Sequence, residues 1–495
     1  MRRRAFCVSA VGAIAATSIP LQRLLAAAES TGAAVPALGP DRKQVILQAS
    51  DIDDLRAAMR GEVLTAGQDG YDSARRVWNG AFDRKPAVIA RCTGAADVIL
   101  AVNFARAHDL LTAVRGGGHS LSGQSVCDGG MMIDLAPMQS VHVDPVGKIA
   151  RVEPGVLLGK LDHETQAFGL ATPAGTVSHT GAAGLTLGGG FGRIARRYGL
   201  ACDNVVAAEI VTAGGKLLRT DVRENPDLLW GLRGGGGNFG VVTSFEYQLH
   251  PVDSMMYGGS LVFPFDVARD VLTFFSGYSA DAPDELYADA FLVGTPDGRK
   301  ALVFDICYSG PLKDAERVLK PLREIRKPIQ DGLRPTPYVA LQKSGDESFA
   351  IGRSYYLKSG FIRRVEPAMV EEVVGRYATA PQGGVIAFAQ HGGAISRVKP
   401  EATAFLHRDA QHSVIIIATW QERAEAEQKM QWARSVWTAV EPMTDGFYVN
   451  ELANDDPERR VRQNYGANYD KLVRLKNQYD PTNLFRLNAN VKPTA

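Results

Sequence analysis

Apolar and polar positions follow two different patterns along this chain, and the first pattern occupies residues 85–253. Residues 86–90 form an apolar run typical of a strand, residues 95–108 carry apolar side chains at helical spacing, and residues 111–114 form a second strand-like run. The pattern predicts a strand–helix–strand unit whose second strand leads directly into a run of glycines.

The rest of this first region alternates between short strands and helices. We predict strands at 131–135, 141–143, 149–152 and 241–249, helices at 156–168 and from Asn225-Pro226-Asp227 onward, and a hairpin at 210–218.

The second pattern begins after His250-Pro251, where strand-like runs dominate. Apolar runs predict strands at 261–263, 286–293, 301–307, 385–389 and 414–418, with helices at 312–326, 366–378 and 422–440. The last segment, 469–485, is expected to be helical at first and then irregular. We therefore predict an α+β protein in which the second region is an antiparallel sheet covered by helices.

The composition excludes several classes of protein. A chain of 495 residues is too long for one ordinary core, so at least two domains are expected. Its 55 basic and 54 acidic residues give a formal charge of +1, which predicts no nucleic-acid or membrane-surface partner. The mean hydropathy of −0.10 is typical of a globular protein.

Residues 1–28 have the organisation of an export signal. A basic start at Arg2-Arg3-Arg4 precedes an apolar run that ends near Leu21, and Ala26-Ala27-Ala28 offers a cleavage site. Arg3-Arg4-Ala5-Phe6 resembles the bacterial twin-arginine signal, which exports folded proteins. An ordinary secretory signal is the alternative. Either one predicts a periplasmic or secreted protein with no membrane span after cleavage.

Removal of this signal would leave four cysteines, and none of them lies in a CxxC pair. Their spacing fits no metal site, so we predict no bound metal. Most are expected to be buried thiols, and one disulfide is possible in an oxidising compartment. The four are Cys92, Cys127, Cys202 and Cys307.

Two glycine runs carry the clearest chemical signal. Arg115-Gly116-Gly117-Gly118-His119-Ser120, here called the first glycine loop, follows a predicted strand, and Gly188-Gly189-Gly190 lies further along the same domain. Glycines let successive backbone N–H groups approach an anion closely. Two such runs in one domain favour a ligand with several phosphates, and His119 adds a reactive group. The combination indicates a covalently held flavin.

Several motifs together resemble one known family. The first glycine loop and Met132-Ile133-Asp134-Leu135 are similar to the vanillyl-alcohol-oxidase superfamily, and within it to the FAD-linked oxidases related to berberine bridge enzyme. The same resemblance extends, in order, over residues 50–495 through 172–176, 184–192, 198–204, 237–242 and 479–485.

The resemblance implies the fold and its boundaries. It implies a two-domain PCMH-type FAD-binding fold, with the FAD domain at 50–253 and an inserted substrate domain at 254–447. The segment 448–495 would return to the FAD domain. The sequence itself predicts no particular oligomeric state.

The resemblance also implies a set of cofactor-binding residues. His119 would bond through a ring nitrogen to the 8α carbon of FAD, while the first glycine loop would hold the pyrophosphate. Arg115 would neutralise a phosphate or brace the loop. The set is Arg115, Gly116, Gly117, Gly118, His119, Ser120, Thr180, Gly181, Gly184, Gly190, Val242 and Asn488, with a plain core strand as the alternative for Val242.

One departure from the family concerns the number of covalent bonds. Many relatives carry a second attachment from a cysteine upstream of the second glycine run, but residues 176–180 read Thr-Val-Ser-His-Thr. We therefore expect a single bond, through His119. We interpret His179 as a loop histidine near the cofactor.

The catalytic residues are harder to identify from the sequence than the cofactor-binding residues. Tyr448-Val449-Asn450-Glu451 resembles the family segment that lies opposite the flavin, although Glu451 replaces a frequent tyrosine. In an extended strand, Tyr448 and Asn450 would share the face toward the flavin and Glu451 would point away, unless a bend follows Asn450. We rank Tyr448 above Glu451 as the proton acceptor, with a surface carboxylate as the alternative for Glu451.

The remaining candidates are polar residues of the substrate domain. A tyrosine base needs a nearby cation, and Lys358 and Arg397 are the first candidates for that cation. Gln390 and His391, at a strand end, are further candidates for the active site. His407-Arg408 is expected to be an internal pair.

The resemblance predicts an FAD-dependent oxidoreductase. It would oxidise a CH–OH or CH–N group of a small organic molecule by hydride transfer to flavin N5, with O2 reoxidising the flavin to give H2O2. The alternatives are a dehydrogenase with another electron acceptor and an exported flavin-binding protein with little turnover.

Overall fold

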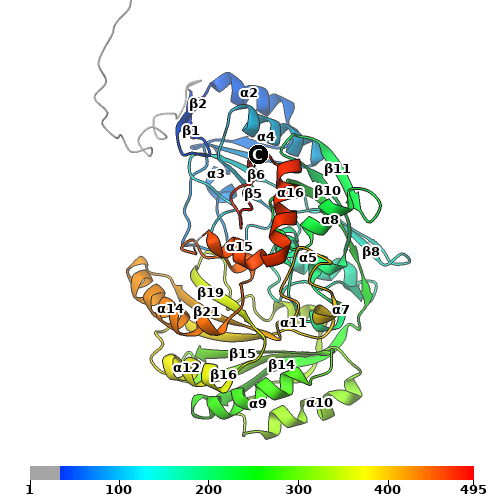
Figure 1. The fold of residues 1–495 in the computed structure, drawn as a ribbon, viewed down its shortest axis with the longest axis vertical. Helices are drawn as coiled ribbons and strands as arrows, with labels where there is room; N and C mark the ends of the chain where they lie inside the picture. The colour runs from blue at the N-terminus through cyan, green and yellow to red at the C-terminus, as the bar shows by residue number, and fades with distance from the viewer. Residues whose placement is uncertain (1–33, 457, 495) are drawn as a thin grey trace, which may run out of the picture.

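The structure is a computed structural model that describes residues 34–456 and 458–494. Two lobes lie one above the other in Figure 1, and the C-terminal helices lie against the upper lobe. The predicted export signal lies outside the described residues. Within the described part of the chain, no helix is long and apolar enough to cross a membrane.

The upper lobe begins with a four-stranded sheet that carries the predicted strand–helix–strand unit. Its strand order is β3-β4-β6-β5, with β6 parallel to both β4 and β5. The elements here are β1 (Val35–Leu38), β2 (Gln44–Leu47), α2 (Ala49–Ala58), β3 (Val63–Leu64), α3 (Tyr71–Ala74), β4 (Val88–Arg91), α4 (Ala95–Ala107), β5 (Thr112–Arg115) and β6 (Met131–Asp134).

A five-stranded antiparallel sheet in the order β11-β10-β12-β8-β7 completes the upper lobe. It includes the predicted hairpin, formed by β10 and β11. Its elements are β7 (Val141–Asp144), β8 (Ile149–Val152), α5 (Leu158–Gln166), β9 (Leu170–Ala171), α6 (Ala182–Gly188), α7 (Ala195–Tyr198), η1 (Ala201–Asn204), β10 (Val205–Val211), β11 (Leu217–Asp221), α8 (Pro226–Leu232), β12 (Val241–Gln248) and β13 (His250–Pro251).

The lower lobe is built on one antiparallel sheet with the main order β17-β14-β16-β15-β20-β21-β19, and β18 also pairs with β14. The elements are β14 (Met255–Pro264), α9 (Ala268–Ala280), β15 (Leu286–Gly294), β16 (Lys300–Tyr308), α10 (Leu312–Glu324), β17 (Gln330–Asp331), β18 (Arg334–Pro337), α11 (Tyr338–Lys343), β19 (Ser354–Ile362), α12 (Pro367–Tyr377), β20 (Gly384–Gln390), α13 (Ala394–Arg397), β21 (His412–Trp420) and α14 (Ala426–Val440). The predicted α+β class, with helices covering this sheet, is confirmed.

The two faces of this lower sheet have different neighbours. On one face, alternate apolar side chains pack under α9, α10, α12 and α14 in the largest core of the molecule. On the other face, Tyr355, Leu357 and Ile417 pack with Trp78 and Leu121 of the upper lobe. The second face is therefore turned toward loops of the upper lobe.

The C-terminal segment returns to the upper lobe through η5 (Val449–Glu451), α15 (Arg459–Tyr465) and α16 (Tyr469–Tyr479). Lys476 fixes it there, because its buried Nζ donates to the Asn238 carbonyl at 2.9 Å, the Phe485 carbonyl at 2.9 Å and Asp480 Oδ2 at 2.6 Å. Helix α16 ends at Tyr479, and the irregular stretch expected after it begins before Pro481, which disfavours helix in the preceding residue.

Candidate active site

The first glycine loop lies directly against the segment that precedes the second glycine run. A Cβ atom added to Gly181 would lie 2.6 Å from the Gly117 nitrogen, and one added to Gly116 would lie 2.9 Å from the Pro154 carbonyl oxygen. Both distances are too short for any side chain. The glycines at these positions therefore permit a close approach of two backbones.

His119 is enclosed between aromatic rings at the end of this loop. Its ring stacks on Trp78 at 4.2 Å between centroids and faces His179 at 5.2 Å. Burial, with a smaller contribution from His179, lowers the pKa of His119 to about 3. The imidazole is therefore neutral at neutral pH, and its buried Nε2 has no hydrogen-bond partner.

Other polar atoms also lack partners. Both ring nitrogens of His179, which faces His119, are buried without a hydrogen bond, and so is the Oδ1 of Asn488 in the C-terminal segment. Buried polar groups in proteins are normally paired, so such a group of unpaired atoms indicates an external partner. The loop contains no carboxylate that would repel phosphates. The residues present therefore fit FAD.

Arg115 and Ser120 flank the loop and brace it. Arg115 Nη1 donates to the Ala74 carbonyl at 2.5 Å and lies 3.6 Å from Asp134, while its Nε has no partner. Ser120 Oγ accepts a hydrogen bond from the Gln124 nitrogen at 3.1 Å. The bracing role expected as one alternative for Arg115 is therefore present.

The other predicted cofactor residues lie in different surroundings. The Thr180 carbonyl accepts from the Leu158 nitrogen at 2.9 Å, and a Cβ at Gly184 would meet no atom within 4 Å. Asn488 Nδ2 donates to the Gly237 and Phe485 carbonyls at 3.1 and 3.0 Å. Val242 is 4% exposed in a hydrophobic core, as its alternative interpretation predicted.

Val449–Glu451 is a 3₁₀ turn that follows an extended Tyr448, so the fully extended arrangement considered for this segment does not apply. Tyr448 Oη accepts hydrogen bonds from the Gly190 nitrogen at 3.0 Å and Asn450 Nδ2 at 2.7 Å. Asn450 Nδ2 also donates to the Leu185 carbonyl at 3.0 Å. The turn forms because these bonds attach the segment to the second glycine run, which hydrophobic alternation does not reveal.

The turn also brings Glu451 toward β19. Burial raises the pKa of Glu451 to about 7, and the Ser359 hydroxyl opposes part of that shift. Glu451 Oε2 is buried and has no hydrogen-bond partner. This carboxyl group can therefore gain or lose a proton near neutral pH.

Comparisons with known proteins agree with these observations. Residues 86–221 match an FAD binding domain, and residues 447–492 match the "Berberine and berberine like" domain. An FAD-linked oxidoreductase of Dictyostelium discoideum is 32% identical over 448 residues, which are 89% of this chain and 97% of the relative. The chain belongs to the berberine-bridge-like FAD-linked oxidoreductases.

Two further relatives have names that specify an activity. The (R)-6-hydroxynicotine oxidase of Paenarthrobacter nicotinovorans is 32% identical, with 88% of this chain and 97% of the relative covered. The crystal structure of 6-hydroxy-D-nicotine oxidase from Arthrobacter nicotinovorans matches with a TM-score of 0.82 and 30% identity, covering 88% and 98% of the two chains. Our protein is accordingly an FAD-dependent oxidoreductase of small organic substrates.

The cations expected beside Tyr448 lie elsewhere in this oxidoreductase. Lys358 Nζ binds Asp455 at 2.6 Å and Asp456 at 2.8 Å, and Arg397 pairs with Asp284 at 2.5 Å. Burial raises the pKa of Tyr448 well above its usual value, while its two hydrogen-bond donors lower it only in part. The tyrosine is therefore protonated at neutral pH.

Gln390 is bound within the sheet of the substrate domain. Its Oε1 accepts from the Ala288 nitrogen at 2.9 Å, and its Nε2 donates to the Ser279 carbonyl at 3.1 Å. Next to it, His391 Nε2 is 3.0 Å from Ser413 Oγ, and burial lowers the pKa of His391 to about 3. These bonds favour a structural role for Gln390, although its catalytic role stays a prediction.

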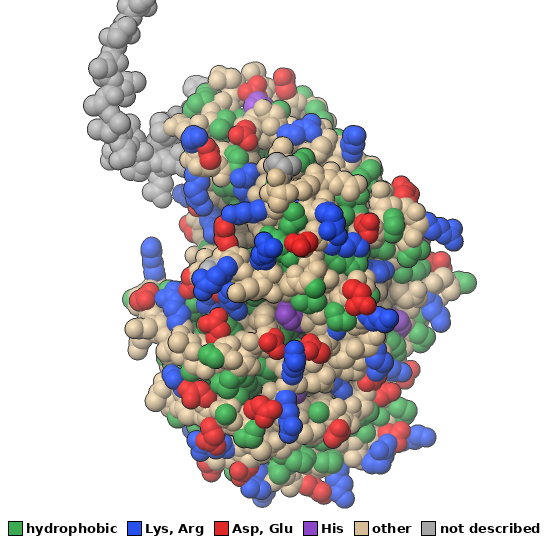
Figure 2. All heavy atoms as spheres, viewed as in Figure 1, with side chains coloured by type: hydrophobic (Ala, Val, Ile, Leu, Met, Phe, Trp, Pro, Cys, Tyr) green, Lys and Arg blue, Asp and Glu red, His purple; other side chains and the backbone are tan. Residues whose placement is uncertain are grey.

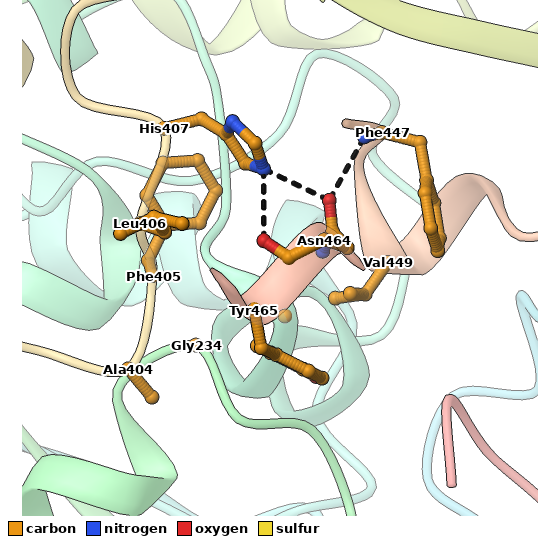
Figure 3. Close-up of a pocket in the computed structure, with 10 residues that line it drawn as sticks. Gly234, Ala404, Phe405, Leu406, His407, Phe447, Val449, Asn464 and Tyr465 are labelled. Atoms are coloured by element: carbon orange, nitrogen blue, oxygen red, sulfur yellow. Dashed lines mark hydrogen bonds between the residues drawn. The ribbon is translucent and has the colours of Figure 1, made fainter. Parts of the chain in front are cut away.

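His407 and Arg408 make internal contacts, but not with each other. His407 Nε2 lies 2.9 Å from Asn464 Oδ1, beside a cavity of about 10 Å³ that has room for one water (Figure 3). Arg408 pairs with both oxygens of Asp203 at 2.7 Å. Neither side chain is free to bind a substrate in this arrangement.

The sequence contains no indication of one residue beside His119. Trp78 stacks on His119, but it precedes the first glycine loop by many residues and lies in no motif.

The four cysteines within the described residues are all buried and free, as most were expected to be. Among those residues, no cluster of histidine, cysteine and carboxylate side chains could hold a metal.

Proposed function

We propose that this protein oxidises a CH–OH or CH–N group of its substrate with FAD attached through His119 alone. The observation that carries the proposal is the neutral, buried His119 ring, whose Nε2 has no partner at the end of a glycine loop. A neutral imidazole has the lone pair that a nucleophile needs. The absence of cysteine from residues 176–180 supports a single attachment.

The backbone around His119 would hold the remainder of the cofactor. The N–H groups of the first glycine loop suit a pyrophosphate. Gly181, Gly184 and Asn488 would contact other parts of FAD. When bound, FAD supplies the two-electron acceptor for the hydride that leaves the substrate carbon.

We assign the proton acceptor to Glu451 and a donor role to Tyr448. The Tyr448 oxygen already accepts two hydrogen bonds, so its own proton is available to a third partner. The Glu451 carboxyl has an unpaired buried oxygen and a pKa of about 7, which suits a general base at neutral pH. This assignment reverses the ranking made from the sequence.

We further propose that O2 is the final electron acceptor and that the product is H2O2. The proposal is supported by the relatives whose names call them oxidases, including a chitooligosaccharide oxidase of Gibberella zeae. A dehydrogenase using another acceptor is the competing function. Turnover that forms stoichiometric peroxide in air favours the oxidase. Dye reduction without peroxide would identify a dehydrogenase.

Export in the folded state is proposed from the sequence of the first residues. Arg3 and Arg4 precede an apolar run as in twin-arginine signals. Replacing both by lysine should leave a flavin-containing precursor in the cytoplasm. Unchanged activity in the periplasm would contradict this route.

The attachment itself is tested by acid precipitation. The wild-type pellet should stay yellow, and a tryptic peptide containing His119 should carry the added mass of FAD. Complete release of the yellow colour into the supernatant would disprove covalent attachment.

A further inference from the structure

Trp78 lies between the histidine that would bind FAD and the substrate domain. Its ring stacks on His119 with 4.2 Å between centroids and 14° between planes, and on Tyr355 of β19 with 4.0 Å and 17°. Two rings at these distances cannot share one face of the indole, because their atoms would overlap. Trp78 is therefore enclosed between His119 of the upper lobe and Tyr355 of the lower lobe.

Hydrogen bonds hold this tryptophan from both lobes. Its backbone nitrogen donates to the Gly118 carbonyl at 2.9 Å, directly before His119 in the first glycine loop. Its indole Nε1 donates to the Phe349 carbonyl at 2.7 Å, and its own carbonyl accepts from the Gly352 nitrogen at 2.9 Å. Trp78 is therefore bound to the glycine loop through its backbone and to the substrate domain through both its backbone and its indole.

The next two residues strengthen the same connection. The buried Asn79 donates through Nδ2 to the Leu121 carbonyl at 2.7 Å and to the Tyr355 carbonyl at 2.9 Å, and its Oδ1 accepts from the Tyr355 nitrogen at 2.9 Å. A Cβ added to Gly80 would lie 2.1 Å from the Gly352 carbonyl oxygen. Residues 78–80 therefore join the substrate domain to the backbone on both sides of the attachment histidine.

The stack restricts how His119 can present its nitrogens. Trp78 covers one face of the imidazole, and a second ring at 5.2 Å has no room on that face, so His179 covers the other. Only the ring edge is left, and the buried Nε2 on that edge has no hydrogen-bond partner. A nucleophile held in one orientation reacts faster than one that must find it, and a displacement of about 1 Å can cost roughly 10²-fold in rate.

We propose that Trp78 is a positioning residue for the attachment of FAD to His119, and that the substrate domain sets its position through the ring of Tyr355. This inference rests on the proposed attachment. The new C–N bond would replace one hydrogen of the 8α methyl group of FAD and the N–H hydrogen of the imidazole. The two electrons and two protons released would pass to the FAD ring, and O2 would remove them as H2O2. Trp78 takes no part in these transfers.

The arrangement also sets the order of assembly. Tyr355 follows the first glycine loop by more than two hundred residues, so the stack is complete only after the lower lobe has been synthesised and has packed on the upper one. Attachment would then be fast only in a chain in which both lobes are folded. Such an order suits an enzyme that carries its cofactor when it is exported.

The test is a time course of FAD attachment to the full chain, made by cell-free synthesis with FAD in air. Gel filtration gives the total FAD bound by each folded protein, and acid precipitation gives the covalent part. Trp78→Phe and Trp78→Leu are the matched pair, because both remove the indole N–H and only phenylalanine keeps a flat ring. Per bound FAD, Trp78→Leu should attach flavin about 10- to 100-fold more slowly than wild type, and Trp78→Phe should recover most of that rate.

A second pair makes the same comparison from the substrate domain. Tyr355→Phe and Tyr355→Leu both remove the hydrogen bond from the hydroxyl to the Ala350 carbonyl, so the ring alone distinguishes them. The leucine variant should attach flavin more slowly than the phenylalanine variant, with a smaller difference than at Trp78. Trp432→Leu, which removes an indole packed on the core under α14, is the control and should attach flavin as wild type does.

Several outcomes would overturn the inference. They are equal rates per bound FAD in the two Trp78 variants, equal rates in the two Tyr355 variants, or a loss in Trp432→Leu as large as in Trp78→Leu. Where Trp78→Leu does not fold, the Tyr355 pair decides. Release of all flavin from acid-precipitated wild type would contradict the proposed attachment itself. Acid-stable flavin in wild type with equal rates within each pair would contradict this inference alone.

Discussion

Backbone atoms position the His119 side of the site, whereas side chains position the turn at Tyr448–Glu451. Around His119, two chains approach so closely that a Cβ at Gly181 would lie 2.6 Å from the Gly117 nitrogen. In the turn, Asn450 and Tyr448 hold one another at 2.7 Å. The first arrangement depends on the absence of side chains and is visible in the sequence. The second depends on which side chains meet, and only the fold reveals it.

The surfaces of the two regions differ as well. His119 is enclosed by aromatic rings, while Phe291 and Ile415 on the inner face of the sheet are partly exposed. In Figure 2, charged side chains of both signs are scattered over the visible face, and no large patch of one sign stands out.

The largest effect on folding is expected from a side chain added where two backbone segments approach closely. Gly117→Ala would force the new Cβ into Gly181, so little folded flavoprotein should form. Gly277→Ala is the matched control, because its Cβ would meet no atom within 4 Å on helix α9 and should stabilise the protein by about 0.5–1 kcal/mol. Soluble yield, thermal midpoint and flavin content measure both. Normal flavin content in Gly117→Ala would contradict the close approach.

His119→Ala should change the attachment of FAD but not the fold. The side chain makes no hydrogen bond through Nε2, so its loss leaves no partner unpaired. Acid precipitation should release all the flavin from this variant and none from wild type. His163→Ala, which removes an exposed histidine from helix α5, should retain the flavin. Covalent flavin in His119→Ala would show that FAD is attached through another residue.

The sequence indicated a close backbone approach on the His119 side, because glycines are needed where no side chain fits. It also predicted the antiparallel sheet of the substrate domain, since β-branched and aromatic runs at 286–293 and 414–418 indicate strands. It left the conformation of 448–451 open between an extended strand and a bend, and the structure has a 3₁₀ turn at Val449–Glu451. Hydrogen bonds from Gly190 and to Leu185, more than two hundred residues away, determine that turn.

The sequence also could not predict which charged side chains pair or which carboxyl groups are buried. Lys358 was a reasonable partner for Tyr448 by residue type, but strand alternation and Asp455 and Asp456 hold it on the other face of β19. The raised pKa of Glu451 has burial as its main cause, and burial is a property of packing. The sequence alone therefore gives no direct indication of the raised pKa of Glu451.

Gln390→Ala should have the smallest effect on chemistry and a clear effect on stability. Removing its two buried hydrogen bonds leaves the Ala288 nitrogen and the Ser279 carbonyl unpaired, at about 1–3 kcal/mol each. The thermal midpoint should fall, while the rate of flavin reduction stays within a few-fold of wild type. Gln428→Ala, on the exposed face of α14, should change neither. A large loss of reduction rate in a stable Gln390→Ala would restore its catalytic assignment.

The assignment of the proton acceptor is tested most directly by anaerobic flavin reduction from pH 5.5 to 8.5, compared among wild type, Tyr448→Phe and Glu451→Gln. Since the base must be ionised, the wild-type rate should rise with pH through about 7, the pKa of Glu451. Dividing each variant's rate by the wild-type rate cancels ionisation of the substrate itself. Glu451→Gln should be slower at pH 8 by roughly 10²–10⁴, with the rise near pH 7 abolished. Tyr448→Phe should keep that rise and lose less rate. A rise that persists in Glu451→Gln, together with the larger loss in Tyr448→Phe, would contradict the account and return the base to the tyrosine.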